Sequence, residues 1–330
     1  MIEYFTGFFS YPAGNNLPWD GISKKIFFVV SLLLVIAFIL VSLFKRPIYN
    51  SYHNKANKYL FFKNERTLNF VIGISTLAFV LVRIGILATS NFPNKWEIIP
   101  LHLCRLNIVI FSILLIINKT KYLKYILFTS VVGALIALAL PDLSSKTNEI
   151  VKVNGVIQQL SPKGEFTFNG AGLDNYFFYD YLLAHGFILI APLVFFILNN
   201  QKISLRDFVI MLAIILGLII FTFTLNSILD NVIPADSKYK EWRSNWFYNG
   251  TNEVNSKFSR LIKPITLWPY MIFTQLFFAN LFMFAVLGIY MFQDKLSVTI
   301  EDKKLKFKII ESQKWNYFKG SLNIKKTSTK

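Results

Sequence analysis

The chain has 330 residues, of which 54% are hydrophobic, 17% aromatic and only 16% charged. Soluble domains carry about a quarter charged residues, so this composition excludes an ordinary soluble globular protein. The formal net charge of +17 does not indicate a nucleic-acid-binding protein, because the lysines and arginines lie between and after long uncharged runs.

Long apolar runs dominate the sequence. A helix needs about 20 apolar residues to cross roughly 30 Å of hydrocarbon, and the clearest run, residues 264–293, contains no charged residue. The pattern predicts an all-α polytopic membrane protein with seven transmembrane helices. The predicted spans are 25–45, 67–89, 98–117, 122–141, 178–199, 206–229 and 265–292.

Lysines and arginines are distributed unequally between the two sides of the predicted bundle. The loops that would share a side with the C-terminal tail carry 21 of them with the tail included, whereas the alternate loops carry 12. Positive residues accumulate on the cytoplasmic side of membrane proteins. The N-terminus is therefore predicted outside and the C-terminus in the cytoplasm, and the protein is predicted to be a multi-pass protein of the cell membrane.

The chain divides into three predicted parts. Residues 1–24 form an outer interfacial segment that lacks the pattern of a cleaved signal peptide. Residues 25–292 form the membrane domain, and residues 293–330 form a basic cytoplasmic tail. Two outer loops of the membrane domain, 142–177 and 230–263, are long enough to hold structure of their own.

The first of these loops contains a β-hairpin signal. Asn154 and Gly155 stand between short runs of β-branched residues at 150–153 and 156–157. An Asn-Gly pair readily takes the positive φ angles of a tight type I′ turn. A small β-hairpin is therefore predicted within 142–177.

The head of the third predicted span, IIPLHLCRLN, carries His102, Cys104 and Arg105. Cys104 is the only cysteine, and it lies six residues below the predicted start of its span. His185 lies seven residues below the predicted start of the fifth span. With a rise of about 1.5 Å per residue, both would be roughly 9–10 Å below the outer ends of their helices. The lone cysteine and the embedded histidine are thus predicted in one layer.

Three more polar residues are predicted near the outer side of the bundle, namely Arg83, Asn226 and Gln275. Polar groups within a membrane normally face the bundle interior. The pattern therefore predicts a polar cavity that opens outward. Two simpler interpretations stay open, since a buried cysteine often acts as a small hydrophobe and arginines can extend their head groups to water.

The residue types favour thiol chemistry over a metal or cofactor site. Three histidines and one cysteine are scattered without the spacing of zinc ligands, and no cofactor is predicted. Cys104 and His102 are two residues apart, or about 200° around a helix, so the base for a Cys104 nucleophile must come from another helix. His185 is the candidate base. His102, Arg105 and Arg83 are candidate donors to a phosphate or a developing oxyanion.

The predicted depth indicates a lipid substrate. The ester carbonyls of glycerolipids lie between the headgroups and the hydrocarbon, where a shallowly buried thiol meets them. Membrane phospholipids or lysophospholipids are therefore the predicted partners, in acyl transfer or acyl hydrolysis. The alternative is a non-enzymatic lipid- or solute-binding or transport protein with the same cavity, and a third interpretation is a hydrogen-bond network that only holds the helices together.

Several motifs resemble a known family. The stretch Pro100–Cys104, P-L-H-x-C at the head of a span, resembles the signature of the YwaF-like integral membrane proteins. The similarity continues in Ala184–Gly186 (A-H-G), in Asn226 and in Trp268–Tyr270 (W-P-Y). It covers residues 25–292 in span order.

The resemblance implies a function and a catalytic pair. Eukaryotic relatives of the YwaF-like family are similar to transmembrane phospholipid acyltransferases that use a cysteine and a histidine, and more distant relatives are lipid hydrolases that use a threonine and a histidine. By that resemblance Cys104 is the acyl-accepting nucleophile and His185 its base. The chain departs from the family in its two long outer loops and in the residues after Asn226.

Overall fold

The computed structural model describes the chain in segments that include all the long helices. The residues outside its description are 1, 5–6, 11–16, 18, 55–61, 63, 91, 93, 144, 148–150, 154–155, 159–165, 169–170, 235–236, 251–266, 302–303 and 323–330.

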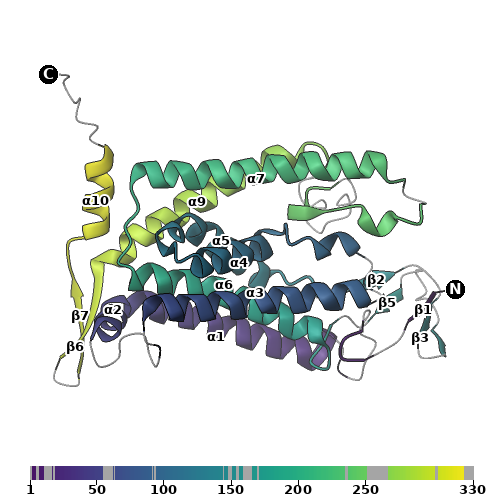
Figure 1. Cartoon of the computed structure of the whole chain (residues 1–330), viewed down its shortest axis with the longest axis horizontal. Helices are drawn as coiled ribbons and strands as arrows, with labels where there is room; N and C mark the ends of the chain where they lie inside the picture. The colour runs from purple at the N-terminus through teal and green to yellow at the C-terminus, as the bar shows by residue number, and fades with distance from the viewer. Residues whose placement is uncertain are drawn as a thin grey trace.

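The described chain is a bundle of helices that run roughly along one direction (Figure 1). Six helical segments of 22 to 28 residues are apolar enough to cross a membrane. Each overlaps one of the predicted spans. They comprise α1 (Lys24–Leu43), which a π-helical turn η1 (Trp19–Ser23) precedes, α3 (Glu65–Thr89), the pair η2 (Lys95–Ile98) and α4 (Leu103–Ile116), α6 (Tyr176–Leu198), α7 (Leu205–Val232) and α9 (Met271–Lys295).

Helix α5 (Lys124–Ala139) occupies the place of the fourth predicted span, 122–141. It is apolar and packs against α4, α6, α7 and α9 in the middle of the bundle. With 16 residues it is shorter than the six helical segments of 22 to 28 residues, and it corresponds to about 24 Å of rise. The structure thus has six long spans in its described part, and a seventh crossing through α5 stays a prediction, as does the orientation.

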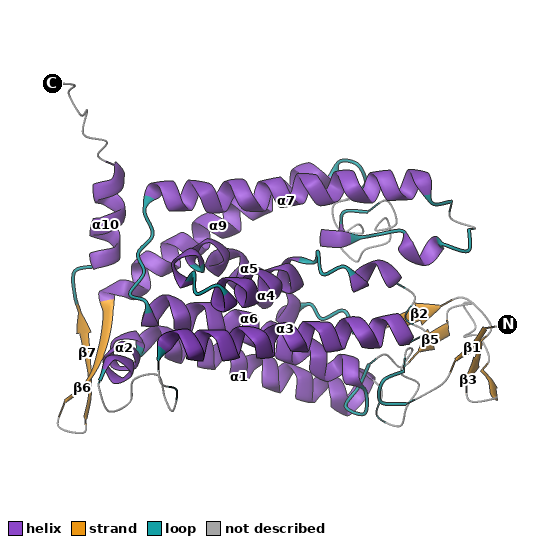
Figure 2. Ribbon diagram, viewed as in Figure 1, coloured by secondary structure: helices purple, strands orange, loops and turns teal. Residues whose placement is uncertain are grey.

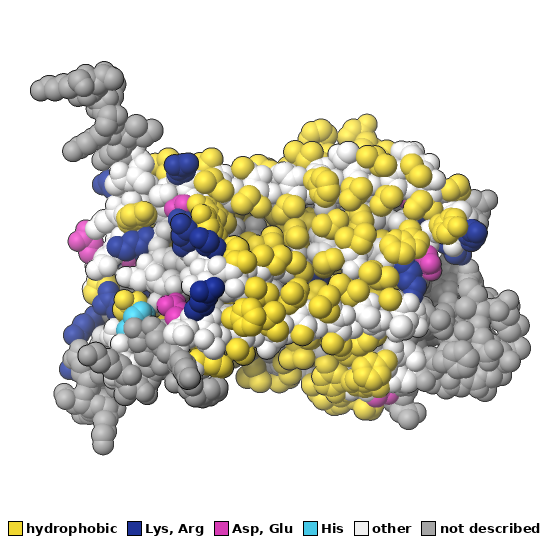
Figure 3. Space-filling model, viewed as in Figure 1, with side chains coloured by type: hydrophobic (Ala, Val, Ile, Leu, Met, Phe, Trp, Pro, Cys, Tyr) yellow, Lys and Arg dark blue, Asp and Glu magenta, His cyan; other side chains and the backbone are white. Residues whose placement is uncertain are grey.

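The side chains on the surface are distributed as expected for a membrane protein. Hydrophobic side chains cover the middle of the bundle, whereas lysine, arginine and acidic side chains gather at its two ends (Figure 3). Large apolar side chains such as Leu32, Phe273 and Phe277 are more than 60% exposed along the helices. A soluble protein rarely exposes an apolar area of this extent, so the helices are built for contact with lipid.

Helix α4 begins later than predicted. Ile99, which precedes Pro100, is extended with φ −83° and ψ 114°, and His102 is the non-helical N-cap. Proline disfavours helical backbone in the residue before it, so the chain leaves η2, turns, and re-enters a helix at Leu103. The prediction of a continuous helix from residue 98 is wrong, because Cys104 is the second residue of α4 and not one and a half turns inside it.

Strands lie only at the two ends of the bundle in the described chain (Figure 2). The predicted hairpin is present, since β3 (Val151–Val153) pairs antiparallel with β4 (Val156–Gln158). Its turn residues, Asn154 and Gly155, lie outside the described residues. The strand β1 (Ile2–Tyr4) joins this hairpin in parallel, and β2 (Ser145–Thr147) pairs with β5 (Phe166–Phe168) beside it.

The opposite end holds the C-terminal segment and a short helix, α2 (Lys45–His53). A hairpin of β6 (Leu296–Glu301) and β7 (Lys304–Ile309) follows α9 directly. Helix α10 (Gln313–Leu322) comes next and packs against α7 and α9. The part of the tail up to residue 322 therefore has regular structure, which its composition alone did not predict.

The loop between α7 and α9 is described except at residues 235–236 and 251–266. Two short 3-10 helices, η4 (Lys240–Trp242) and η5 (Trp246–Tyr248), lie in its first half. A third 3-10 turn, η3 (Thr120–Tyr122), connects α4 to α5. The loop between α7 and α9 reaches back over the N-terminal end of α4, so its aromatic residues lie next to the candidate site.

Candidate functional site

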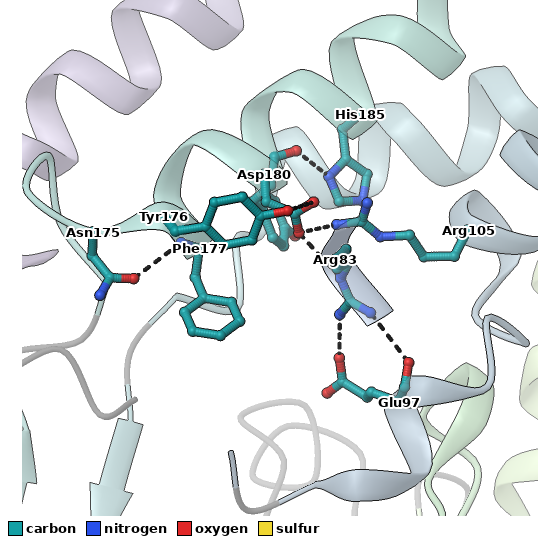
Figure 4. Close-up of polar contacts among 9 residues, drawn as sticks. Arg83, Glu97, Arg105, Asn175, Tyr176, Phe177, Asp180 and His185 are labelled. Atoms are coloured by element: carbon teal, nitrogen blue, oxygen red, sulfur yellow. Dashed lines mark hydrogen bonds and ion pairs between the residues drawn. The ribbon is translucent and has the colours of Figure 1, made fainter. Parts of the chain in front are cut away.

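A buried ion network lies where α3, α4 and α6 meet near the N-terminal end of the bundle (Figure 4). Arg83 on α3 donates from Nε to Asp180 Oδ2 at 3.1 Å and from Nη2 to Glu97 Oε2 at 2.7 Å. Arg105 on α4 pairs with the same Asp180 oxygen through Nη2. The two arginines and Asp180 are 8%, 7% and 3% exposed, so Asp180 joins two buried cations from different helices.

Sequence reasoning identified the two arginines of this network but missed Asp180 and Glu97. A signal was present, because buried arginines within a membrane require an anionic partner. Asp180 is the acidic residue within the predicted fifth span, 178–199. Arg83 and Arg105 were predicted as free donors to substrate, and in the structure most of their donor groups are already engaged. Arg105 Nη1 differs from these groups, since it is buried and has no hydrogen-bond partner.

His185 lies on α6, a little over one turn after Asp180, and is 8% exposed. Its Nδ1 is 2.7 Å from the backbone oxygen of Tyr181. A carbonyl oxygen only accepts hydrogen bonds, so Nδ1 carries the hydrogen and Nε2 of the neutral ring keeps its lone pair. The ring packs against that of Tyr181, with centroids 4.2 Å apart and planes tilted by 42°, and in the close-up it lies beside the Arg105 guanidinium (Figure 4).

Cys104 is a free thiol in the first turn of α4 and is 8% exposed. It packs against α5 at Gly133, where an added Cβ would lie 3.0 Å from Sγ. The absence of a side chain at Gly133 therefore makes the space that the sulfur occupies.

The two predicted catalytic residues are linked to α5 in different ways, Cys104 by direct packing and His185 through Tyr181. Tyr181, against which the His185 ring packs, donates from its hydroxyl to the backbone oxygen of Ala137 at 3.1 Å. Gly133, against which Cys104 packs, is four residues earlier on α5, which is one helical turn on the same face. Helices α4 and α6 also contact each other directly. The thiol thus packs on α5 itself, and the imidazole packs on a tyrosine that bonds to α5 one turn further along.

The third predicted residue of the opening motif, His102, belongs to a separate aromatic cluster. Its ring lies between those of Trp96 and Tyr248, with centroid distances of 5.2 and 5.3 Å. Trp246 packs edge-on against Trp96 at 5.7 Å. The loop after α7 therefore covers the N-terminal end of α4 with aromatic rings.

Asn226 and Gln275, predicted as cavity residues, hold this loop in place. Asn226 donates to the Trp246 backbone oxygen at 2.9 Å and accepts from Ser244 Oγ at 2.7 Å. Gln275 donates to the Phe247 backbone oxygen at 3.0 Å. Their contacts are with the loop backbone and with the side chains of Ser244 and Asn249, while their predicted role toward a substrate stays a prediction.

An apolar groove of about 560 Å³ lies between α1, α3 and α6 on the lipid-facing side of the bundle. It reaches Gly186, the neighbour of His185 in the chain. No polar side chain lines it. The lining residues are Val30, Leu34, Ile72, Leu182, Leu183, Gly186, Phe187, Ile190, Ala191, Val194 and Phe195.

Among the described residues, no group of three or more histidine, cysteine or acidic side chains is arranged to hold a metal ion. The reactive side chains at the site are the Cys104 thiol, the His185 imidazole and the Arg105 guanidinium. These groups come from α4 and α6 and are held by α3 and α5.

Comparison with known proteins identifies the family. The model of the TMEM164 family, a family of transmembrane proteins, matches residues 21–289, which extends from η1 almost to the end of α9. No curated protein and no solved structure matches the chain significantly. Because the match covers most of the membrane bundle, the chain belongs to the TMEM164 family.

Proposed function

We propose that this TMEM164-family protein is a thiol-dependent lipid acyltransferase or acyl hydrolase of the cell membrane. Cys104 is the nucleophile and His185 the base. The proposal is supported above all by the assembly of the buried thiol and an imidazole with an unprotonated Nε2 around Gly133 and Tyr181. The resemblance of Pro100–Cys104 to the YwaF-like signature, and of its relatives to acyltransferases, supports the same pair.

In the proposed first step, Cys104 Sγ attacks the carbonyl carbon of a phospholipid ester while His185 Nε2 takes the thiol proton. The attack forms a tetrahedral oxyanion. Collapse of that intermediate breaks the ester C–O bond, and His185 returns the proton to the leaving lysophospholipid oxygen. Cys104 then holds the acyl chain as a thioester. In the second step, a lysophospholipid hydroxyl or water attacks the thioester carbon while His185 takes its proton. The C–S bond then breaks, which releases phospholipid or fatty acid, and the Cys104 sulfur takes the proton back from His185.

Two features support stabilisation of the oxyanion. Cys104 occupies the first turn of α4, and unpaired backbone N–H groups at a helix N-terminus favour negative charge. Arg105 Nη1 is a buried donor without a partner. Asp180 keeps the Arg105 guanidinium in position through Nη2. Nη1 is then the donor that would bind the oxyanion.

The apolar groove at Gly186 supports a lipid substrate. It holds roughly the volume of a long acyl chain, and all of its lining side chains are apolar. A chain in this groove would leave its ester near His185. The same groove is also the observation that favours the second candidate function, binding or transport of lipid without covalent chemistry.

Turnover measured in proteoliposomes separates the two candidates. We expect wild-type protein to release lysophospholipid and to lose this activity by more than about 100-fold in the variants Cys104→Ala and His185→Ala. His53→Ala is a matched control, because His53 makes the same Nδ1 contact to a backbone oxygen four residues earlier but is exposed on α2. Turnover that is equal in wild type and Cys104→Ala would exclude the enzyme, and retained lipid binding would then favour the alternative.

A further inference from the structure

The hairpin of β6 and β7 lies where the bundle leaves the membrane. Helix α9 is a candidate span that ends at Lys295, and β6 begins at the next residue. The hairpin crosses the end of the bundle and does not continue along the helices (Figure 1). Strand β6 rests against α1 and α2. Its position therefore corresponds to the headgroup layer at this end of the protein.

The register of the hairpin determines which side of β7 faces the bundle. Phe307 is the antiparallel partner of Val298, and Ile309 is the partner of Leu296. Directly opposed residues of paired strands project from the same face of a sheet. Val298 is 1% exposed beneath the packing of β6 on the bundle end. Phe307 and Ile309 therefore project in the direction of the membrane.

Within the described structure, more than half of each of these side chains is left uncovered by protein. Leu305, Phe307 and Ile309 are 53%, 73% and 85% exposed, in contrast to Val298 on the same face. An apolar ridge of this kind, continuous with a packed apolar face and directed along the membrane normal, fits the boundary between headgroups and acyl chains.

The alternate residues of β7 are basic. Lys306 and Lys308 project from the opposite face and are both exposed. The strand from Lys304 to Ile309 contains no acidic residue. Lysines placed next to apolar residues at a membrane surface can bury their stems and reach anionic headgroups with their ammonium groups. The same lysines oppose pairing of this edge strand with a second copy of the chain.

We infer that β7 is an interfacial anchor that inserts Leu305, Phe307 and Ile309 into an anionic leaflet, with Lys306 and Lys308 at the level of the phosphates. The occupant of the exposed apolar face is thus a lipid surface that carries negative charge. The inference depends on the placement of the hairpin and is independent of the proposed catalytic function.

Spin labels on the full-length protein test the insertion. Single cysteines at 305, 306, 307 and 308 would be labelled in a Cys104→Ala background and reconstituted into nanodiscs with or without phosphatidylglycerol. With the anionic lipid, we expect the ratio of oxygen to nickel-complex accessibility to be more than about threefold higher at 305 and 307 than at 306 and 308. A label at Leu32, 61% exposed on α1, gives the reference value for hydrocarbon.

High nickel accessibility at all four positions would overturn the inference, because the apolar face would then be in water. An alternation that is equally strong in neutral nanodiscs would overturn the requirement for anionic lipid. With labels at 305 and 307, the difference in accessibility between nanodiscs with and without phosphatidylglycerol is expected to disappear in the double variant Lys306→Glu with Lys308→Glu. The same difference should persist in Lys319→Glu, an exposed change on α10. An equal loss in the control would show that only net charge matters.

Discussion

Both ends of the bundle contain buried ion pairs, but the cations differ, with arginines at one end and a lysine at the other. Near the N-terminal end, Arg83 and Arg105 converge on Asp180, and Glu97 completes the balance. At the C-terminal end, Lys45 binds Asp294, with Nζ 3.2 Å from Oδ1. Arginine keeps its charge at every physiological pH and binds carboxylates through a planar fork, whereas lysine can lose its proton on burial. The first network is therefore permanently charged, and the second can titrate.

The C-terminal cluster also holds α10 against the bundle. Asp294 accepts hydrogen bonds from Ser312 Oγ at 3.0 Å and from the backbone N–H of Lys314 at 3.1 Å. The Lys314 ammonium lies 4.2 Å from the ring centroid of Tyr290 and 5.2 Å from that of Phe196. The N-terminal network therefore fixes helices next to the site, whereas the C-terminal cluster fixes a segment whose attachment can respond to pH.

The largest expected effect comes from removal of the shared acid. Asp180→Asn leaves two buried arginines without their common anion, and breaking a buried ion pair in this way costs about 3–5 kcal/mol. We expect a strongly lowered melting temperature in detergent. The corresponding change Asp230→Asn removes the partner of a single arginine, Arg243, whose side chain is 16% exposed, and is expected to cost less. Equal melting temperatures for wild type and Asp180→Asn would contradict the permanent role of the network.

The contact between α3 and α4, the two helices that carry the arginines, should be the next most sensitive feature. A Cβ at Gly73 would lie 2.9 Å from both Ile116 Cγ1 and the Ser112 backbone oxygen. Gly73→Val is therefore expected to cost about 1–3 kcal/mol by forcing the helices apart. Gly85→Val on the same helix is the control, since nothing lies within 4 Å of its added Cβ. Similar unfolding of both variants would show that the effect is one of helix propensity.

A smaller effect is expected from pH at the C-terminal end. Burial, together with the positive charge of Lys45, lowers the pKa of Lys314 to about 7, while Asp294 acts in the opposite direction. Burial likewise lowers the pKa of Lys45, against the attraction of Asp294. The docked segment binds the Lys314 proton more weakly than a free segment does, so docking strengthens as pH rises from about 7 toward the ordinary lysine pKa of 10.5.

Hydrogen exchange of α10 at matched intrinsic rates measures this effect. Protection of residues 313–322 should be greater at pH 8.5 than at pH 6.5 in wild type and independent of pH in Lys314→Met. The same dependence in Lys314→Met would assign the titration to another group. The exchange of α3 serves as the internal reference, because its arginine network does not titrate in this range.

The sequence predicted the helices well because long apolar runs carry their own signal. The end of α3 at Thr89 agrees with the prediction, while α4 departs from it because Pro100 forces an extended residue before it. The β3–β4 hairpin was predictable from the Asn-Gly pair. Regular structure in the tail was not, because the hairpin and α10 depend on contacts with α1, α2, α7 and α9.

The candidate site could be predicted only in part. Cys104 and His185 were visible as rare residues within apolar runs, and both are buried in the structure, while their action as a catalytic pair stays a prediction. Asn226 and Gln275 were also visible, but their contacts are with a loop that is distant in the sequence, and no local pattern reveals such pairing. Asp180 could have been found by asking which acid balances the buried arginines.

The most direct test of the central claim is intact-mass spectrometry of protein incubated with mixed phospholipids and lysophospholipids. We expect a hydroxylamine-labile acyl adduct that maps to Cys104, is lost in His185→Ala and is unchanged in His53→Ala. An adduct on another residue would contradict the assignment. Lipid turnover that proceeds without any dependence on Cys104 would contradict the thiol mechanism itself.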